Sequence, residues 1–144
     1  MRSLDRLDLT MVRMKLLSSS EEGPVWEPST LDLAEHEYRR FLALNLMYPD
    51  KEVVPCKLVD ALWHAHILDT EAYARDCDDL FGYFLHHFPY FGLRGEEDAT
   101  QLWTAYGTTI DLYTEAFGSP PEGVWRPEDA MKCERKNCKP QKCR

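Results

Sequence analysis

Hydrophobic side chains recur along this chain at intervals of three and four residues, the spacing of one face of an α-helix. The longest such stripe falls within residues 96–117, and its members are Leu102, Tyr106, Ile110, Tyr113 and Phe117. Shorter stripes predict further helices over about residues 1–17, 30–47, 56–68 and 71–87. The stripe over residues 30–47 consists of Leu31, Ala34, Tyr38, Phe41 and Leu42. Because no window shows the sustained alternation typical of a strand, the sequence predicts an all-α fold of four to five helices.

Breaks in this pattern divide the chain into three parts. A Ser/Glu/Gly/Pro stretch follows the first helix, and Gly118 with two prolines closes the last one. The length of 144 residues fits a single small domain. We expect an N-terminal helix and linker over residues 1–28, a helical core over residues 29–122, and a flexible tail over residues 123–144.

The charge is unevenly distributed. The chain carries 17 basic and 25 acidic residues, but residues 132–144 hold six basic residues and one acidic residue, a net charge of +5. The acidic remainder argues against nucleic-acid binding, so we expect the aromatic cluster to serve core and turn packing: Phe84, Phe88, Tyr90 and Phe91. The chain shows neither a membrane-length apolar run nor the apolar core of a signal peptide, and we expect a cytoplasmic protein without membrane contact.

Four of the five histidines fall between residues 64 and 87. In the helix predicted over residues 56–68, His66 lies at the centre of an apolar arc, whereas Asp60 and His64 lie one turn apart on the far side. A carboxylate in this position fixes the tautomer of the histidine and leaves the other ring nitrogen available to a metal or a proton.

If the helices over residues 56–68 and 71–87 form an antiparallel hairpin, the start of the second helix lies beside both histidines, and its far end lies ~20 Å away. The spacing then predicts a zinc or non-haem iron site with His64, His66 and Cys77 as ligands, Asp60 and Tyr73 as supporting groups, and a separate second candidate site at His86 and His87. The alternative is structural: a surface contact between Asp60 and His64, and a core His66 bonded to a backbone carbonyl.

The predicted tail carries cysteines with the spacing C-x4-C-x4-C, namely Cys133, Cys138 and Cys143. Three thiols at this spacing suit one soft ion, and the flanking Lys and Arg residues favour the thiolate. The alternatives are a segment that binds an unknown protein partner, a substrate for a modifying enzyme, or a basic end held to the acidic body by charge alone. Under these alternatives the protein is a non-catalytic interaction module.

The run Val59–Leu68 (VDALWHAHIL), followed by Tyr73, Asp76-Cys77 and Gly82, resembles the core motif of the glycine-rich domain-containing protein-like family. Residues 37–50 and 84–98 are similar to its short bacterial members, and the resemblance covers about residues 30–118. It implies a helical domain without an established reaction and draws attention to Trp63, His64, His66, Tyr73 and Cys77. This chain has only seven glycines and lacks the glycine-rich segment of larger relatives.

Overall fold

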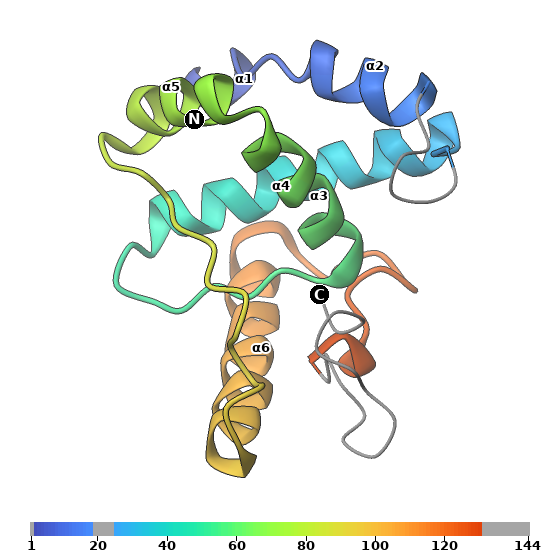
Figure 1. The fold of residues 1–144 in the computed structure, drawn as a ribbon. Helices are drawn as coiled ribbons and strands as arrows, with labels where there is room; N and C mark the ends of the chain where they lie inside the picture. Colours follow the sequence, from blue (N-terminus) through green and yellow to red (C-terminus); the bar gives the residue numbers. More distant parts are fainter. Residues whose placement is uncertain (1, 19–24, 131–144) are drawn as a thin grey trace. The chain divides into compact units, whose positions relative to one another are not determined.

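The computed structural model describes residues 2–18 and 25–130 (Figure 1). Its elements are α1 (Arg2–Asp5), α2 (Thr10–Ser18), α3 (Pro28–Met47), α4 (Lys57–Leu68), α5 (Thr70–Phe81), α6 (Glu96–Phe117) and the 3-10 helix η1 (Pro127–Ala130). The described residues contain no strand, which confirms the all-α prediction. None of their helices combines the length and the apolar character needed to cross a membrane. The predicted tail cysteines, Cys133, Cys138 and Cys143, lie outside the described residues.

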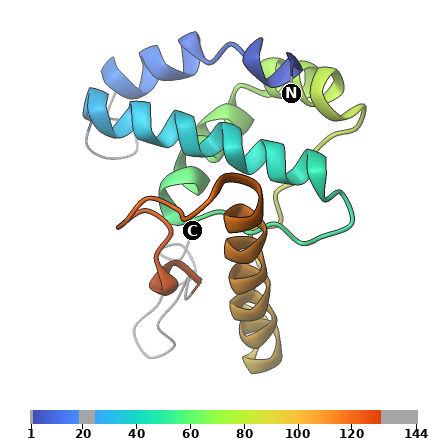
Figure 2. The ribbon, with the colours of Figure 1, turned by 180° about the vertical axis from the view of Figure 1, so that it is seen from behind.

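The chain divides into two compact units. The first contains Met1–Met47 and Leu58–Leu85, and the second contains Tyr48–Lys57 and His86–Arg144. In the first unit, α3 buries the predicted stripe, which includes Leu31, Tyr38 and Phe41. The buried faces of α4 and α5 complete this core, and α1 contacts both α3 and α5. Figures 1 and 2 show α1 and α2 following one side of α3.

The predicted continuous helix over residues 1–17 is wrong, because the chain breaks between Asp5 and Thr10. At the break, the Asp8 carboxylate accepts a hydrogen bond of 2.9 Å from the backbone N–H of Thr10, the residue that begins α2. Leu7 and Leu9 are both buried on either side of that aspartate. A continuous helix would turn two residues so spaced to different faces, so the break lets both leucines pack.

The predicted helix over residues 71–87 ends early, at Phe81. Gly82 has a left-handed φ of 76°, and its N–H donates to the carbonyl of Asp78. Glycine commonly ends a helix in this way, because it has no Cβ to clash in the left-handed conformation. His86 and His87 therefore lie beyond the helix. The aromatic cluster meets the expected turn, which spans residues 89–92, but the expectation of core packing is wrong. Three of its members are about half exposed: Phe84, Phe88 and Tyr90.

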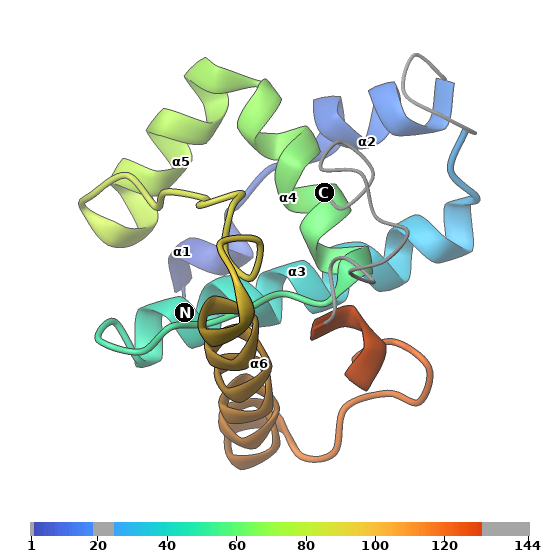
Figure 3. The ribbon, with the colours of Figure 1, turned by 60° about the horizontal axis from the view of Figure 1, so that its bottom comes forward.

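In the second unit, α6 packs against the segment that follows it and against η1 (Figure 3). The ring centroids of Trp125 and Tyr113 lie 5.4 Å apart, and Val124 and Ala130 are also buried. The backbone N–H of Lys57 donates to the buried Asp129 carboxylate at 3.2 Å. The packed region thus extends to Ala130, beyond the predicted boundary at residue 122.

Replacing Trp125 with alanine tests this corrected boundary. The ring is buried against α6, so we expect the free energy of unfolding to fall by about 3 kcal/mol in urea titrations. Trp103→Ala is the matched control, since Trp103 is exposed and its loss should cost less than about 0.5 kcal/mol. Equal effects of the two substitutions would contradict the assignment of residues 123–130 to the packed unit.

Candidate functional site

A hydrogen-bonded chain of three side chains lies at the centre of the first unit. His66 of α4 is 1% exposed, and its Nδ1 lies 2.7 Å from the Tyr38 hydroxyl of α3. Its Nε2 lies 2.8 Å from Oδ2 of Asp76 on α5. An ionised carboxylate only accepts, so Nε2 carries the proton and donates to Asp76, while Nδ1 accepts from the tyrosine hydroxyl. Each of the three helices contributes one member of this chain.

Burial controls the protonation of this chain. It lowers the pKa of His66, an effect that the hydrogen bond from His66 to Asp76 opposes only in part. Burial also raises the pKa of the Tyr38 hydroxyl well above its ordinary value. The arrangement therefore favours a neutral tyrosine and a neutral imidazole beside a carboxylate. Because Tyr38 is completely buried, its hydroxyl is closed to a dissolved substrate, and the chain serves to join the three helices.

A second network joins α4 and α5 to the segment after α5. The Trp63 indole N–H donates to the Tyr73 hydroxyl at 2.9 Å, and that hydroxyl donates to the carbonyl of Leu85. The N–H of Leu85 in turn points to the Cys77 sulfur at 3.5 Å. The Tyr73 ring also meets the His66 ring edge-on, with 4.9 Å between centroids. Tyr73 and Cys77 thus secure the exit of the chain from α5.

The predicted metal-ligand set is not assembled in the described residues. The ligand atoms of His64, His66 and Cys77 do not all lie within 4.8 Å of one another. The reason is helical geometry, since positions 64 and 66 point about 200° apart around α4. Both ring nitrogens of His66 are also engaged by protein partners, so His66 is not bonded to a backbone carbonyl as the structural alternative proposed.

Asp60 and His64 lie on a different face of α4 from His66, as the helical spacing predicted. The His64 Nε2 is 3.7 Å from Oδ2 of Asp60, and the His64 side chain is 38% exposed. The Asp60 side chain is only 13% exposed, so the pair joins a partly exposed histidine to a largely covered carboxylate one turn away along α4. The other predicted histidines, His86 and His87, belong to the second unit.

Two residues of the central chain, Tyr38 and Asp76, were not predicted as site residues from the sequence. Tyr38 appeared as one member of a hydrophobic stripe, and Asp76 as one position of the family motif. The available signal was weak: Asp76 follows Tyr73 by three residues and so shares its side of α5. The spacing of apolar residues does not indicate that α3 and α5 both pack against α4 at the level of His66.

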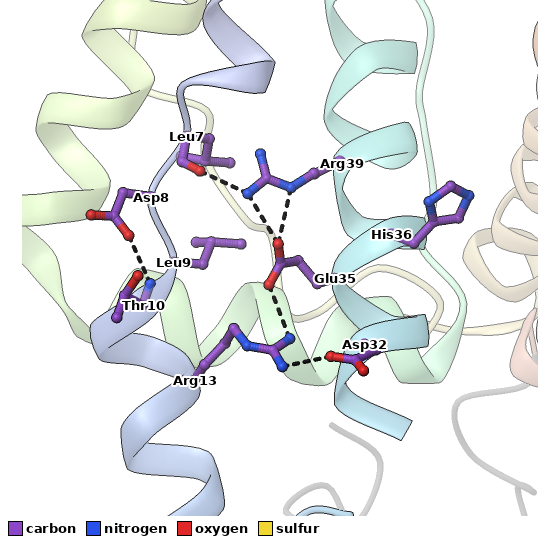
Figure 4. A pocket seen from close by; sticks show the side chains of 9 residues that line it. All are labelled: Leu7, Asp8, Leu9, Thr10, Arg13, Asp32, Glu35, His36 and Arg39. Atoms are coloured by element: carbon purple, nitrogen blue, oxygen red, sulfur yellow. Dashed lines mark hydrogen bonds and ion pairs between the residues drawn. The ribbon is translucent and has the colours of Figure 1, made fainter. Parts of the chain in front are cut away.

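A polar cavity of about 540 Å³ lies between the α1–α2 segment and α3 (Figure 4). Glu35 lies between two guanidinium groups, with 3.0 Å to Arg13 and 3.0 Å to Arg39. Arg39 also donates to the carbonyl of Leu4 in α1 and to that of Leu7, which follows α1. Carbonyls at a helix end lack intrahelical partners, and the guanidinium supplies hydrogen bonds there beside the one that Leu4 accepts from the Leu7 N–H. The walls of the cavity thus attach the N-terminal segment to α3.

The described residues define an all-α protein organised around a buried tyrosine–histidine–aspartate chain. The family model described as UCP032817-like matches residues 10–106, which is more than half of the chain. The chain therefore belongs to the UCP032817-like family. Searches of curated proteins and of solved structures returned no match. The matched range includes all three members of the buried chain and the Asp60–His64 pair.

The lowered pKa of His66 predicts a stability that decreases in acid. The unfolded chain takes up a proton near the ordinary pKa of 6.5, whereas folded His66 does so only at lower pH. Its contribution is therefore complete above pH 6.5 and is lost as the pH falls toward the folded value. In urea titrations between about pH 7.5 and 5.5, the stability of the wild type relative to His66→Gln should fall. A difference that is independent of pH would contradict the neutral histidine.

Substitution of Arg39 by lysine tests the attachment of the N-terminal segment. Lysine keeps the charge but loses the planar group that reaches Glu35 and two carbonyls together. We expect a loss of about 1–2 kcal/mol in stability and faster hydrogen exchange over residues 10–18. Arg75→Lys is the control, since the Arg75 side chain is 69% exposed. Unchanged exchange in Arg39→Lys would show that the arginine does not hold this segment.

Proposed function

We propose that this protein binds a divalent transition-metal ion, zinc or non-haem iron, on α4, with His64 and Asp60 as ligands. The observation that carries the proposal is the pair itself: an imidazole and a carboxylate one turn apart, with Nε2 and Oδ2 separated by 3.7 Å. Imidazole and carboxylate groups are common ligands of both metals. This proposal retains the predicted metal but changes the predicted ligand set.

The other residues of the histidine motif have protein partners within the first unit. Trp63, Tyr73 and Cys77 join α4 and α5 to the following segment. His66 is enclosed between Tyr38 and Asp76. His64 is the motif histidine that lies outside both networks, and its side chain is 38% exposed. The motif residues in these networks are held by their protein partners, whereas the partly exposed His64 ring can be reached by a ligand.

The spacing of the pair fits a shared ion. Two ligands at ~2.0–2.1 Å from a tetrahedral ion lie ~3.3 Å apart, so a small side-chain rotation brings Nε2 and Oδ2 into place. Two protein ligands leave further coordination positions for water or for a bound molecule. An ion held in this way polarises what it binds, while Asp60 and His64 fix its position on α4.

We further propose that the resemblance to the glycine-rich domain-containing protein-like family reflects a real relationship. Its support is that the resembling residues Trp63, Tyr73 and Cys77 act together in one network rather than separately. We also propose a cytoplasmic location, which accords with the buried thiol of Cys77.

Zinc titration of the full chain, prepared without a histidine tag, tests the metal proposal. We expect about one equivalent of zinc to bind, and His64→Ala or Asp60→Asn to raise the dissociation constant about tenfold or more. Competition with a chromophoric chelator measures this constant. His36→Ala is the matched control, because the His36 Nε2 also lies beside a carboxylate, 3.8 Å from Glu37, yet on α3.

Three results separate the remaining explanations. Equal losses in His36→Ala and His64→Ala would indicate nonspecific binding by surface histidines. A loss in the double substitution of His86 and His87, with none in His64→Ala, would favour the second predicted site. A chain that binds no zinc would overturn the proposal and leave the non-catalytic interaction module as the better account.

A further inference from the structure

The exposed face of α6 carries acidic side chains near both ends of the helix. The helix has 22 residues, of which five are acidic and none is Lys or Arg. Its exposed positions include a line at alternating spacings of four and three residues: Glu97, Gln101, Thr104, Thr108, Asp111 and Glu115. Such spacing keeps side chains on one face of a helix. This line, which we call the acidic line, carries three negative charges and no positive charge.

An exposed aromatic ring lies on the same helix, about 100° around its axis from Thr104 of the acidic line. Trp103 is 52% exposed, an unusual position for the largest apolar side chain. Gly107 follows one turn later, and a Cβ built there would meet no atom within 4 Å. A glycine inside a helix costs about 1 kcal/mol relative to alanine, and no positive φ requires it at this position. Because Gly107 has no side chain, the helix surface one turn from the indole is open. The face of an indole ring is a favourable binding surface for a cation.

The chain itself contains a segment of complementary charge. Residues 131–144 follow η1, and η1 contacts α6. This segment contains six basic residues and one acidic residue. At ~3.3 Å per residue, its 14 residues reach ~46 Å, whereas the 22 residues of α6 extend ~33 Å. The segment therefore begins beside α6 and is long enough to reach every position on the acidic line.

We propose that residues 131–144 dock on the acidic line of α6 in the same chain, with a Lys or Arg side chain reaching around the helix to the Trp103 ring. The attachment to η1 holds the segment at high effective concentration, so weak contacts suffice. Ion pairs with Glu97, Asp111 and Glu115 provide most of the attraction, which salt therefore weakens. The docked segment would hold its three cysteines against α6. The proposal is independent of the metal site on α4.

Disulfide trapping in the full chain tests the docking. Thr108→Cys places a thiol on the acidic line, where the native tail cysteines, Cys133, Cys138 and Cys143, serve as partners. With oxidised glutathione at low salt, we expect it to form a disulfide with the tail at least fivefold faster than Ala74→Cys, an exposed control on α5. Peptide mapping identifies the bond. At about 0.5 M salt, where the Debye length is only a few ångströms, the two rates should converge.

Charge substitutions in the Thr108→Cys background separate docking from chance collision. Neutralising the acidic line with Glu97→Gln, Asp111→Asn and Glu115→Gln should slow trapping to the rate of the control. Neutralising three exposed acids of α5 with Glu71→Gln, Asp78→Asn and Asp79→Asn should leave trapping unchanged. Equal rates for Thr108→Cys and Ala74→Cys would overturn the proposal. So would insensitivity to salt, or disulfides formed mainly between two chains.

Discussion

The first unit depends on the burial of one histidine between two helices other than its own. His66 projects from α4 and bonds Tyr38 on α3 and Asp76 on α5. A buried polar ring left without partners costs about 1–3 kcal/mol per unmet group, so the packing that covers His66 is favourable only when both neighbours are in place. This requirement fixes which turns of the three helices face one another. The aromatic contacts around the ring follow from that register.

Polar groups serve two other purposes in the molecule. In the cavity beside α3, Arg39 forms an ion pair with Glu35 and donates a hydrogen bond to the carbonyl of Leu4. These charged groups therefore hold the N-terminal segment against α3. On α6, by contrast, exposed acids of one sign have no basic side chain on their own helix. The charges beside α3 are paired within the fold, whereas the exposed acids of α6 attract a basic partner. The distinction indicates where an external or terminal segment would bind.

Much of the fold could be predicted, because helical periodicity is a local property. The spacing of apolar residues indicated α3, α4 and α6 to within a few residues, and it placed His66 on a buried face. The errors arose where a single residue overrides periodicity. Gly82 ends α5 before the stripe ends, and Asp8 interrupts the N-terminal helix. Trp125, which lies outside any long helix, carried no periodic signal for its packing on α6.

The sequence by itself determined the helical class, the inward direction of His66, the outward direction of His64, and the charge contrast between body and tail. These follow from residue spacing and composition, which need no knowledge of neighbours. Only the tertiary structure decided the partners. It assigned both nitrogens of His66 to Tyr38 and Asp76, and Tyr73 to Trp63, because those contacts join different helices. A helical wheel describes one helix at a time and contains no information on the helix that packs against it.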